Sequence, residues 1–355
     1  MPFVNVKRLY GASRLKQNLA TMRAKFAEGA AVAAPRAGSL DYLPIGLFGS
    51  VMGLTGLSVA WHLAHARFGV PDVVAQVISA VAVVAFVLLT CAYAAKIVMS
   101  PEAAKNELAH PIAGNLFGTF LISLLLLPIV LAPLSLIVAR AMWAIGAIGM
   151  TTFAWFIVDR WMSQRQKAAH ATPVWIIPVV GMLDVPLAMP ALGLESLHAV
   201  MVFGLAVGLF FTAPLFTLVF SRLLFEEPLP DALQPSLMIL LAPFAVGTST
   251  YVVTMGQVDV FAEALFALTL FMLAVTMGRL RYLAACCPFR VSWWAVSFPL
   301  AATAVAALRI ASARPGGLMA TIAIALLALA TVVIAGLLIR TVAGLCRGEL
   351  RTLSA

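Results

Sequence analysis

The sequence VSWWAVSFPLAATAVAALRIA, residues 291–311, is apolar over the length that a helix needs to cross a bilayer, about 20 residues. Phe298 and Pro299 stand together in its first half, and small residues follow them. A proline inside a membrane helix frees the carbonyl four residues earlier, which then needs protein or water nearby. We therefore expect a bent membrane helix that faces other parts of the protein rather than lipid.

The rest of the chain has the composition of a membrane protein. Of its 355 residues, 63% are hydrophobic and 10% are charged, and the mean hydropathy is +1.04. Soluble proteins carry about a quarter of charged residues. The net charge of +9 does not indicate a nucleic-acid partner, because basic residues also collect in the cytosolic loops of membrane proteins. The composition predicts an all-α integral membrane protein in the lipid bilayer, with no nucleic acid bound.

Ten apolar runs of membrane-spanning length follow one another along the chain. They cover residues 43–63, 71–97, 112–131, 136–158, 173–192, 198–220, 235–254, 260–278, 291–311 and 317–340. These runs predict ten transmembrane helices within a domain at 41–346. A basic cytosolic tail is expected at 1–40 and a short cytosolic tail at 347–355.

The basic residues are divided unequally between the two sides of such an array. If the N-terminus is cytosolic, 19 of the 23 Lys and Arg residues fall on the cytosolic side. Cytosolic loops carry the excess of positive charge in membrane proteins. We therefore expect both termini in the cytosol and a multi-pass protein of the plasma membrane, which is the inner membrane in a bacterium.

The prolines alternate along the predicted helices. Odd-numbered runs contain Pro128, Pro178, Pro243 and Pro299. Even-numbered runs have none in their interiors, apart from Pro214 in the sixth. Because a proline needs protein or water around the carbonyl that it frees, this pattern predicts five helical hairpins. The bent odd-numbered member of each faces inward, and the straighter even-numbered member faces lipid.

Small residues follow the same odd-numbered runs. The first run carries four glycines at spacings of 3, 4 and 3, which place them on one stripe of a helix. Such a stripe either admits a neighbouring helix closely or leaves room for a pore, and packing explains it equally well. A hydroxyl inside a membrane helix bonds its own backbone by default. The pore-lining candidates are Gly46, Gly49, Gly53, Gly56, Pro128, Pro178, Pro243, Thr248, Ser249 and Ser297.

The apolar runs lack the groups that catalysis needs. No acid pair, HExxH, GxSxG or phosphate-binding loop occurs on them, and the four cysteines have no metal-binding spacing. We therefore expect no enzyme, no cofactor and no metal. The acid Asp184 is an exception, since it lies near the middle of the fifth run. An ionisable residue there is a functional candidate, and we favour a structural pairing with Arg309 or Arg314 over a proton-coupling role.

Four segments resemble a known family of membrane proteins. They are LPIGLFGSVMGLTGLSVAW (43–61), HPIAGNLFG (110–118), RLLFEEPLPDALQPSLMILLAPFAVGTSTYV (222–252) and SWWAVSFPLAATAVA (292–306). In their order they are similar to the tellurite-resistance and dicarboxylate transporter family, which includes bacterial TehA and the plant guard-cell slow anion channels. The segments extend over nearly the whole predicted membrane region.

The resemblance implies a fold and a site. It implies ten helices as five hairpins around a quasi-fivefold central pore, lined by the odd-numbered helices, in a homotrimer. Phe298 would be the occluding ring of the pore, beside Pro299. Without the resemblance, core packing would be the ordinary role of this phenylalanine. Asp184 departs from the family's pattern.

Three functions remain open at this point. The first is an anion channel that passes small inorganic or organic anions through a pore gated by Phe298. The second is a proton-coupled carrier or exporter of C4-dicarboxylate, sulfite or tellurite-like oxyanions, in which Asp184 would titrate. The third, a membrane scaffold without transport, explains neither the bent helices nor the glycine stripe.

Overall fold

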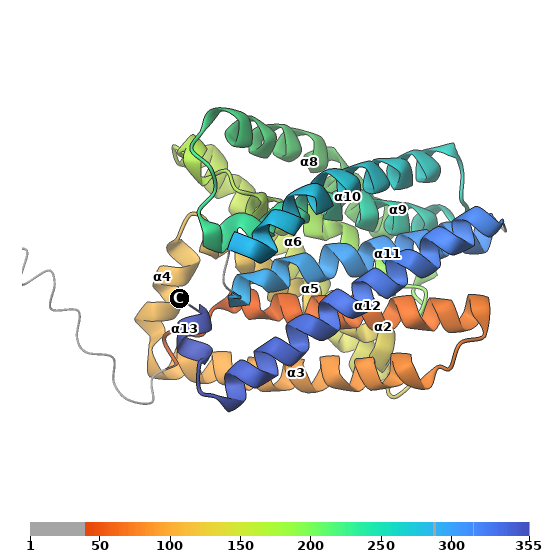
Figure 1. The fold of residues 1–355 in the computed structure, drawn as a ribbon, viewed down its shortest axis with the longest axis horizontal. Coiled ribbons are helices and arrows are strands. Elements are labelled where there is room, and N and C mark those ends of the chain that lie inside the picture. The colour runs from red at the N-terminus through yellow and green to blue at the C-terminus, as the bar shows by residue number, and fades with distance from the viewer. Residues whose placement is uncertain (1–39, 287–288, 315, 355) are drawn as a thin grey trace, which may run out of the picture. The chain divides into compact units, whose positions relative to one another are not determined.

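The computed structural model describes residues 40–286, 289–314 and 316–354, with the backbone alone for 280–286. The predicted N-terminal tail at 1–40 therefore lies almost wholly outside the described residues. Within these ranges, nine helical spans are long and apolar enough to cross a membrane. Figure 1 shows several of them, among them α2, α3, α11 and α12, running along a common direction.

The long helices coincide with nine of the predicted runs, although about half of their ends differ by five to eight residues. They are α2 (Phe48–Phe68), α3 (Val73–Met99), α5 (Phe117–Leu131), α6 (Leu136–Ser163), α8 (His198–Phe225), α9 (Ala242–Met255), α10 (Val260–Cys286), α11 (Ser297–Ala313) and α12 (Gly317–Cys346). Three short helices accompany them: α4 (Pro101–Ala109), α7 (Ile177–Val180) and α13 (Leu350–Ser354). The chain is thus an all-helical, multi-pass membrane protein.

The fifth predicted helix, residues 173–192, is the main departure from the expectation. Its apolar part is the shorter stretch Pro173–Ala188, which divides into η4 (Pro173–Ile176), α7, η5 (Gly181–Asp184) and η6 (Pro186–Ala188). Prolines begin η4 and η6 and stand in the first turn of α7, so regular α-helical bonding is interrupted repeatedly.

Neighbouring helices satisfy carbonyls of this broken segment. The Thr250 hydroxyl of α9 donates to the carbonyl of Leu183 at 2.5 Å, and the Trp143 indole of α6 donates to that of Val185 at 2.9 Å. Irregular backbone at membrane depth is tolerated only where protein or water surrounds it. The segment can therefore exist only inside a shell of intact helices.

Burial separates the long spans into an inner and an outer set. Between 61% and 83% of the residues are buried in the apolar windows of the odd-numbered spans Ile45–Phe68, Ala113–Leu131, Asp231–Met255 and Val291–Ala313. Between 11% and 39% are buried in the five even-numbered spans. Large apolar side chains such as Leu88 and Phe210 are exposed on the outer set. As the proline pattern predicts, the odd-numbered segments face inward and their partners face outward.

The prolines of the inner segments lie mostly at helix starts, which differs from the expected mid-helix bends. A 3₁₀ turn precedes each inner helix: η1 (Ile45–Leu47), η2 (Ala113–Leu116), η4, η8 (Asp231–Leu241) and η9 (Val291–Val296). Pro243 and Pro299 fall in the first turn of the α-helix that follows, and only Pro128 of the expected four stands well inside one. A first-turn proline costs little, because its missing N–H would lack a helical partner anyway.

The glycine stripe of α2 lets α11 approach closely. A Cβ atom added at Gly53 would overlap the side chain of Ser297, and one added at Gly56 would lie 3.0 Å from the Cβ of Ala301. The Ser297 hydroxyl reaches across to the carbonyl of Gly49 at 3.2 Å. Small residues let two backbones approach in a membrane, so this contact holds the two helices together.

A bulky residue at Gly53 is therefore expected to destabilise the protein. Gly53→Leu should lower the free energy of unfolding in detergent by about 1–3 kcal/mol, because the side chain must displace α11. Gly336→Leu is the matched control, since a Cβ at Gly336 of α12 meets nothing within 4 Å. Thermal unfolding followed by far-ultraviolet circular dichroism compares them, and equal losses for both variants would contradict the packing role.

A buried ion pair fixes the start of the first inner segment. The Lys96 ammonium lies 2.6 Å from a carboxylate oxygen of Glu107 in α4 and donates to the carbonyl of Leu43 at 2.7 Å. The other Glu107 oxygen accepts from the backbone N–H of Ile45 at 2.8 Å. Lys96 is 2% exposed. The pair thus ties α3 and α4 to the backbone on both sides of Pro44.

Removal of one partner should leave the other charge buried and unpaired. Glu107→Gln is expected to destabilise the protein by about 3–5 kcal/mol, the usual cost of breaking a buried pair. Glu102→Gln, which breaks the exposed pair with Lys105 on the same helix, should leave the melting temperature almost unchanged. A thermal shift assay on both variants tests this, and a melting temperature for Glu107→Gln equal to that of the wild type would refute it.

Candidate functional site

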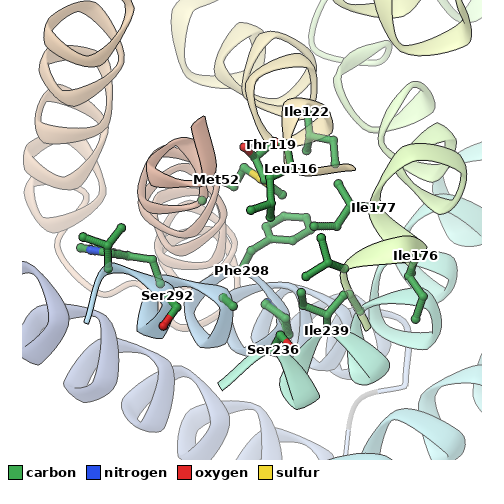
Figure 2. Close-up of a pocket in the computed structure, with 18 of the residues that line it drawn as sticks. Met52, Leu116, Thr119, Ile122, Ile176, Ile177, Ser236, Ile239, Ser292 and Phe298 are labelled. Carbon is green, nitrogen blue, oxygen red and sulfur yellow. Dashed lines mark hydrogen bonds between the residues drawn. The ribbon is translucent and has the colours of Figure 1, made fainter. Parts of the chain in front are cut away.

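A cavity of about 310 Å³ lies among the inner segments. All five of them contribute lining residues, and Figure 2 shows side chains from these elements converging on it. The contributions include Gly49 and Met52 from α2, Thr119 and Ile122 from α5, Ile177 and Asp184 from the broken fifth segment, Ser236 and Ile239 from η8, and Ser292 and Phe298 from η9 and α11. The lining is mostly apolar, so the cavity suits a partly dehydrated solute.

Helix starts surround this cavity. Four lining residues lie within three residues of the first turns of α2, α5, α9 and α11, namely Gly46, Leu116, Ala242 and Trp294 in that order. The N-terminus of an α-helix carries a partial positive charge. Arg290, just before η9, also lines the cavity. The region therefore combines an apolar wall with a diffuse positive potential.

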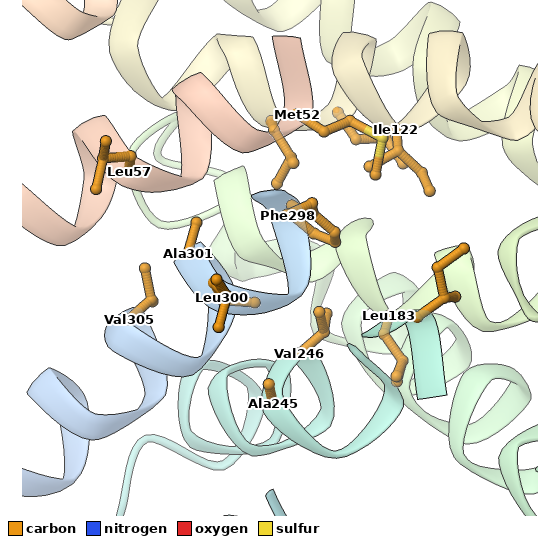
Figure 3. Packing of buried hydrophobic residues seen from close by; sticks show 14 of the residues in the cluster. Met52, Leu57, Ile122, Leu183, Ala245, Val246, Phe298, Leu300, Ala301 and Val305 are labelled. Atoms are coloured by element: carbon orange, nitrogen blue, oxygen red, sulfur yellow. The ribbon is translucent and has the colours of Figure 1, made fainter. Parts of the chain in front are cut away.

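The side chain of Phe298 forms part of the wall of the large cavity. Its ring lies among residues of several inner segments, with Thr119, Leu116 and Ile177 beside it in Figure 2 and Met52 and Val246 near it in Figure 3. The residue is 9% exposed. Gly56 leaves space against the ring, since a Cβ there would lie 3.7 Å from its nearest carbon.

A second cavity, of about 30 Å³, lies on the other side of Phe298. From α11, the small cavity is lined by Phe298 and by residues of the following turns: Ala302, Val305 and Arg309. The same part of the chain lines the large cavity with residues at or before the first turn: Trp294, Ala295, Phe298 and Pro299. Phe298 and Val246 line both cavities. The phenylalanine ring therefore stands between two spaces that follow one another along α11.

The predicted site residues divide into two groups. Those that line one of the two cavities are Gly46, Gly49, Gly56, Asp184, Ser249, Phe298 and Pro299. Those that line neither are Gly53, Pro128, Pro178, Pro243, Thr248 and Ser297. Two members of the second group bond their own backbone: the Thr248 hydroxyl donates to the carbonyl of Phe244 at 2.8 Å, and that of Ser297 donates to the carbonyl of Trp294 at 2.7 Å.

Asp184 lies at the wall of the large cavity without the partner expected for it. It is 2% exposed, and its Oδ1 atom has no hydrogen-bond partner among the described residues. The expected pairing with Arg314 is not formed, because Arg314 pairs with Glu263 at 2.9 Å. Arg309 lines the small cavity instead, and no ion pair joins it to Asp184 in the described part of the chain. Arg314 is thus engaged by another acid, and Arg309 forms no ion pair among the described residues.

Most lining residues received no pore role from the sequence, and three of them are instructive. Thr55 and Arg309 line the small cavity, and Leu353 of α13 lines the large one. Thr55 follows the glycine stripe, and Arg309 is a charge within an apolar run, so the sequence pattern could have indicated both as lining residues. Leu353 carried none, because its place depends on how the chain folds back after α12.

Comparison with known proteins identifies the family. The sequence model described as SLAC1: Voltage-dependent anion channel matches residues 42–342. The S-type anion channel SLAH3 of Arabidopsis thaliana is 28% identical over 311 residues, which are 84% of this chain and 48% of SLAH3. The uncharacterized transporter MJ0762 of Methanocaldococcus jannaschii is 30% identical over 216 residues, 55% of this chain and 63% of that protein.

A bacterial relative is matched over more of its length. The tellurite resistance protein TehA homolog of Haemophilus influenzae is 27% identical over 281 residues, 74% of this chain and 79% of the homolog. The chain spans about half the length of SLAH3. Because the family match covers most of the membrane region, the chain belongs to the SLAC1 family of voltage-dependent anion channels, which are channels and not enzymes.

Proposed function

We propose that the protein is an anion channel whose central pore is closed by the ring of Phe298. The observation that carries this proposal is the position of Phe298 between two cavities that follow one another along α11. Displacement of one side chain would join the two spaces. Gly56 presents no side chain to the ring, and the residues Ala301 and Ala302 on the following turn of α11 are small.

Apart from the carboxyl of Asp184, the surroundings of the ring favour anions over cations. An aromatic ring in a narrow apolar passage blocks hydrated ions by steric hindrance and by dewetting. Its edge carries partial positive charge and can face an anion. The helix starts around the large cavity, together with Arg290, add a diffuse positive potential. The substrates are therefore small inorganic or organic anions.

The arrangement of the channel follows from the same features. We place the ten apolar segments in five hairpins around a quasi-fivefold pore, which the contribution of all five inner segments to the large cavity supports. The excess of basic residues on one side supports cytosolic termini and an insertion in the plasma membrane. A homotrimer is proposed from the family resemblance.

Removal of the ring should open the channel. Phe298→Ala is expected to raise the anion conductance of the purified protein in a planar bilayer at least about tenfold, because the steric and dewetting barrier is lost. The current should reverse near the anion equilibrium potential in a chloride or nitrate gradient.

The matched control replaces a phenylalanine on the outer surface. Phe210 of α8 is 71% exposed and lines neither cavity, so Phe210→Ala should conduct like the wild type. Wild-type currents from Phe298→Ala, or large currents from both variants, would refute the gate.

A proton-coupled carrier of C4-dicarboxylate, sulfite or tellurite-like oxyanions is the second candidate. The observation that favours it is the buried carboxyl of Asp184, which lines the large cavity with an oxygen that has no partner among the described residues. Such a group can take up a proton together with an anionic substrate, so that the net charge moved is reduced.

The two candidates differ in what Asp184→Asn does. In a carrier, the substitution abolishes uptake of dicarboxylate driven by a pH gradient in proteoliposomes. In the channel that we propose, passive anion flux persists within about twofold and stays independent of the pH gradient, because no proton is coupled to it. Asp159→Asn, at an exposed position of the outer helix α6, is the control for effects of a lost carboxylate.

A further inference from the structure

Three residues that line the small cavity beyond Phe298 each have a buried polar atom without a partner in the described part of the chain. The atoms are the hydroxyl oxygens of Thr55 and Ser249 and the Nε of Arg309, from α2, α9 and α11. Each is buried and has no hydrogen-bond partner among the described residues. We propose that this cavity is a binding site for one small monovalent inorganic anion, such as chloride or nitrate. The inference rests on the proposed anion channel and names the site at which it selects its ion.

The two hydroxyls differ from others in the same helices. A membrane threonine or serine ordinarily donates to a carbonyl three or four residues earlier. Thr248 donates to Phe244, and Thr303 donates to Pro299, each within 2.8 Å. Thr55 and Ser249 are 0% and 2% exposed and make no such bond. A buried hydroxyl without a partner is costly, so a bound acceptor would account for both.

Unpartnered hydroxyls alone do not define the site. Thr90 and Thr254 also lack a partner within the described ranges, and they line neither cavity. What distinguishes the small cavity is that two hydroxyls and a guanidinium converge there from three different helices.

Arg309 decides between an anion and a water molecule. Its guanidinium is a fixed positive charge, and it has no carboxylate partner in the described part of the chain. The neighbouring acid Glu263 is occupied by Arg314, and Asp184 lines the other cavity. A charge inside an apolar segment needs a counter-charge or access to water. A water molecule could bridge the donors but would leave the positive charge uncompensated.

The size of the cavity restricts the ligand. A volume of about 30 Å³ has room for about one water molecule or one ion of similar size. A halide or a nitrate fits such a space, whereas a four-carbon dicarboxylate with two charged ends does not. Much of the remaining lining is apolar, as at Leu126 and Val305. The site therefore suits a dehydrated monovalent anion.

Bromide identifies the site directly. Crystals of the wild-type protein grown in sodium bromide should show an anomalous difference peak in the cavity between Phe298 and Arg309. The peak should be absent in Arg309→Gln and retained in Arg314→Gln, the matched control on the same helix end, whose arginine pairs with Glu263. An empty cavity in the wild type at molar bromide would overturn the inference.

Conduction supplies an independent readout. In the Phe298→Ala background, the chloride concentration for half-maximal current should rise roughly tenfold in Arg309→Gln, the size of effect expected when a charge-assisted hydrogen bond is lost. Ser249→Ala and Thr55→Val should raise the half-saturating chloride concentration by a smaller factor. These two variants still test the site if Arg309→Gln does not fold. Arg314→Gln should leave this concentration unchanged.

The outcomes separate this inference from the channel itself. If Phe298→Ala conducts anions and the small-cavity variants leave half-saturation unchanged, the site is refuted and the channel stands. If Phe298→Ala passes no anion current, the channel proposal fails, and the bromide peak alone then decides whether the cavity binds an anion.

Discussion

A backbone carbonyl that loses its helical partner inside a bilayer must find another donor within the protein, and the inner part of this structure depends on that constraint. The broken segment Pro173–Ala188 meets it through Thr250 and Trp143, which donate to its carbonyls from α9 and α6. Intact outer helices enclose the irregular backbone and present apolar side chains outward. The irregular segment forms one wall of the large cavity. The same broken backbone that would be costly in contact with lipid therefore shapes the site.

Close approach of helices is the second requirement of the site. The carbonyl of Gly49 and the hydroxyl of Ser297 form a contact between α2 and α11 that only small residues allow, and this contact positions Phe298 one residue further along. The glycine stripe, for which packing and pore lining were alternative explanations, therefore both admits α11 closely and lines cavities. Gly53 packs against α11, whereas Gly46, Gly49 and Gly56 line cavities.

The sequence predicted the helical spans and their inner or outer placement, because hydropathy and prolines report directly on contact with lipid. It did not predict the 3₁₀ starts of the inner segments, since a 3₁₀ turn and an α-helical turn have similar apolar patterns. Pro299 therefore looked like a mid-helix bend and lies in a first turn. The sequence also could not predict which charged residues pair with one another. Arg314 pairs with Glu263, 51 positions away in the sequence, and no local pattern indicates such a contact.

The order of charges along the pathway has a consequence for selectivity. Asp184 lines the large cavity and Arg309 the small one, with the ring of Phe298 between them. Helix geometry places Arg309 about 16 Å beyond Phe298 along α11, because each residue advances the helix by about 1.5 Å. Asp184 and Arg309 form no ion pair in the described part of the chain. An ionised Asp184 would draw a cation toward the ring, and Arg309 would repel it beyond the ring. In the channel that we propose, an anion meets the reverse order, so displacement of the ring would favour the binding of anions over cations at the small cavity.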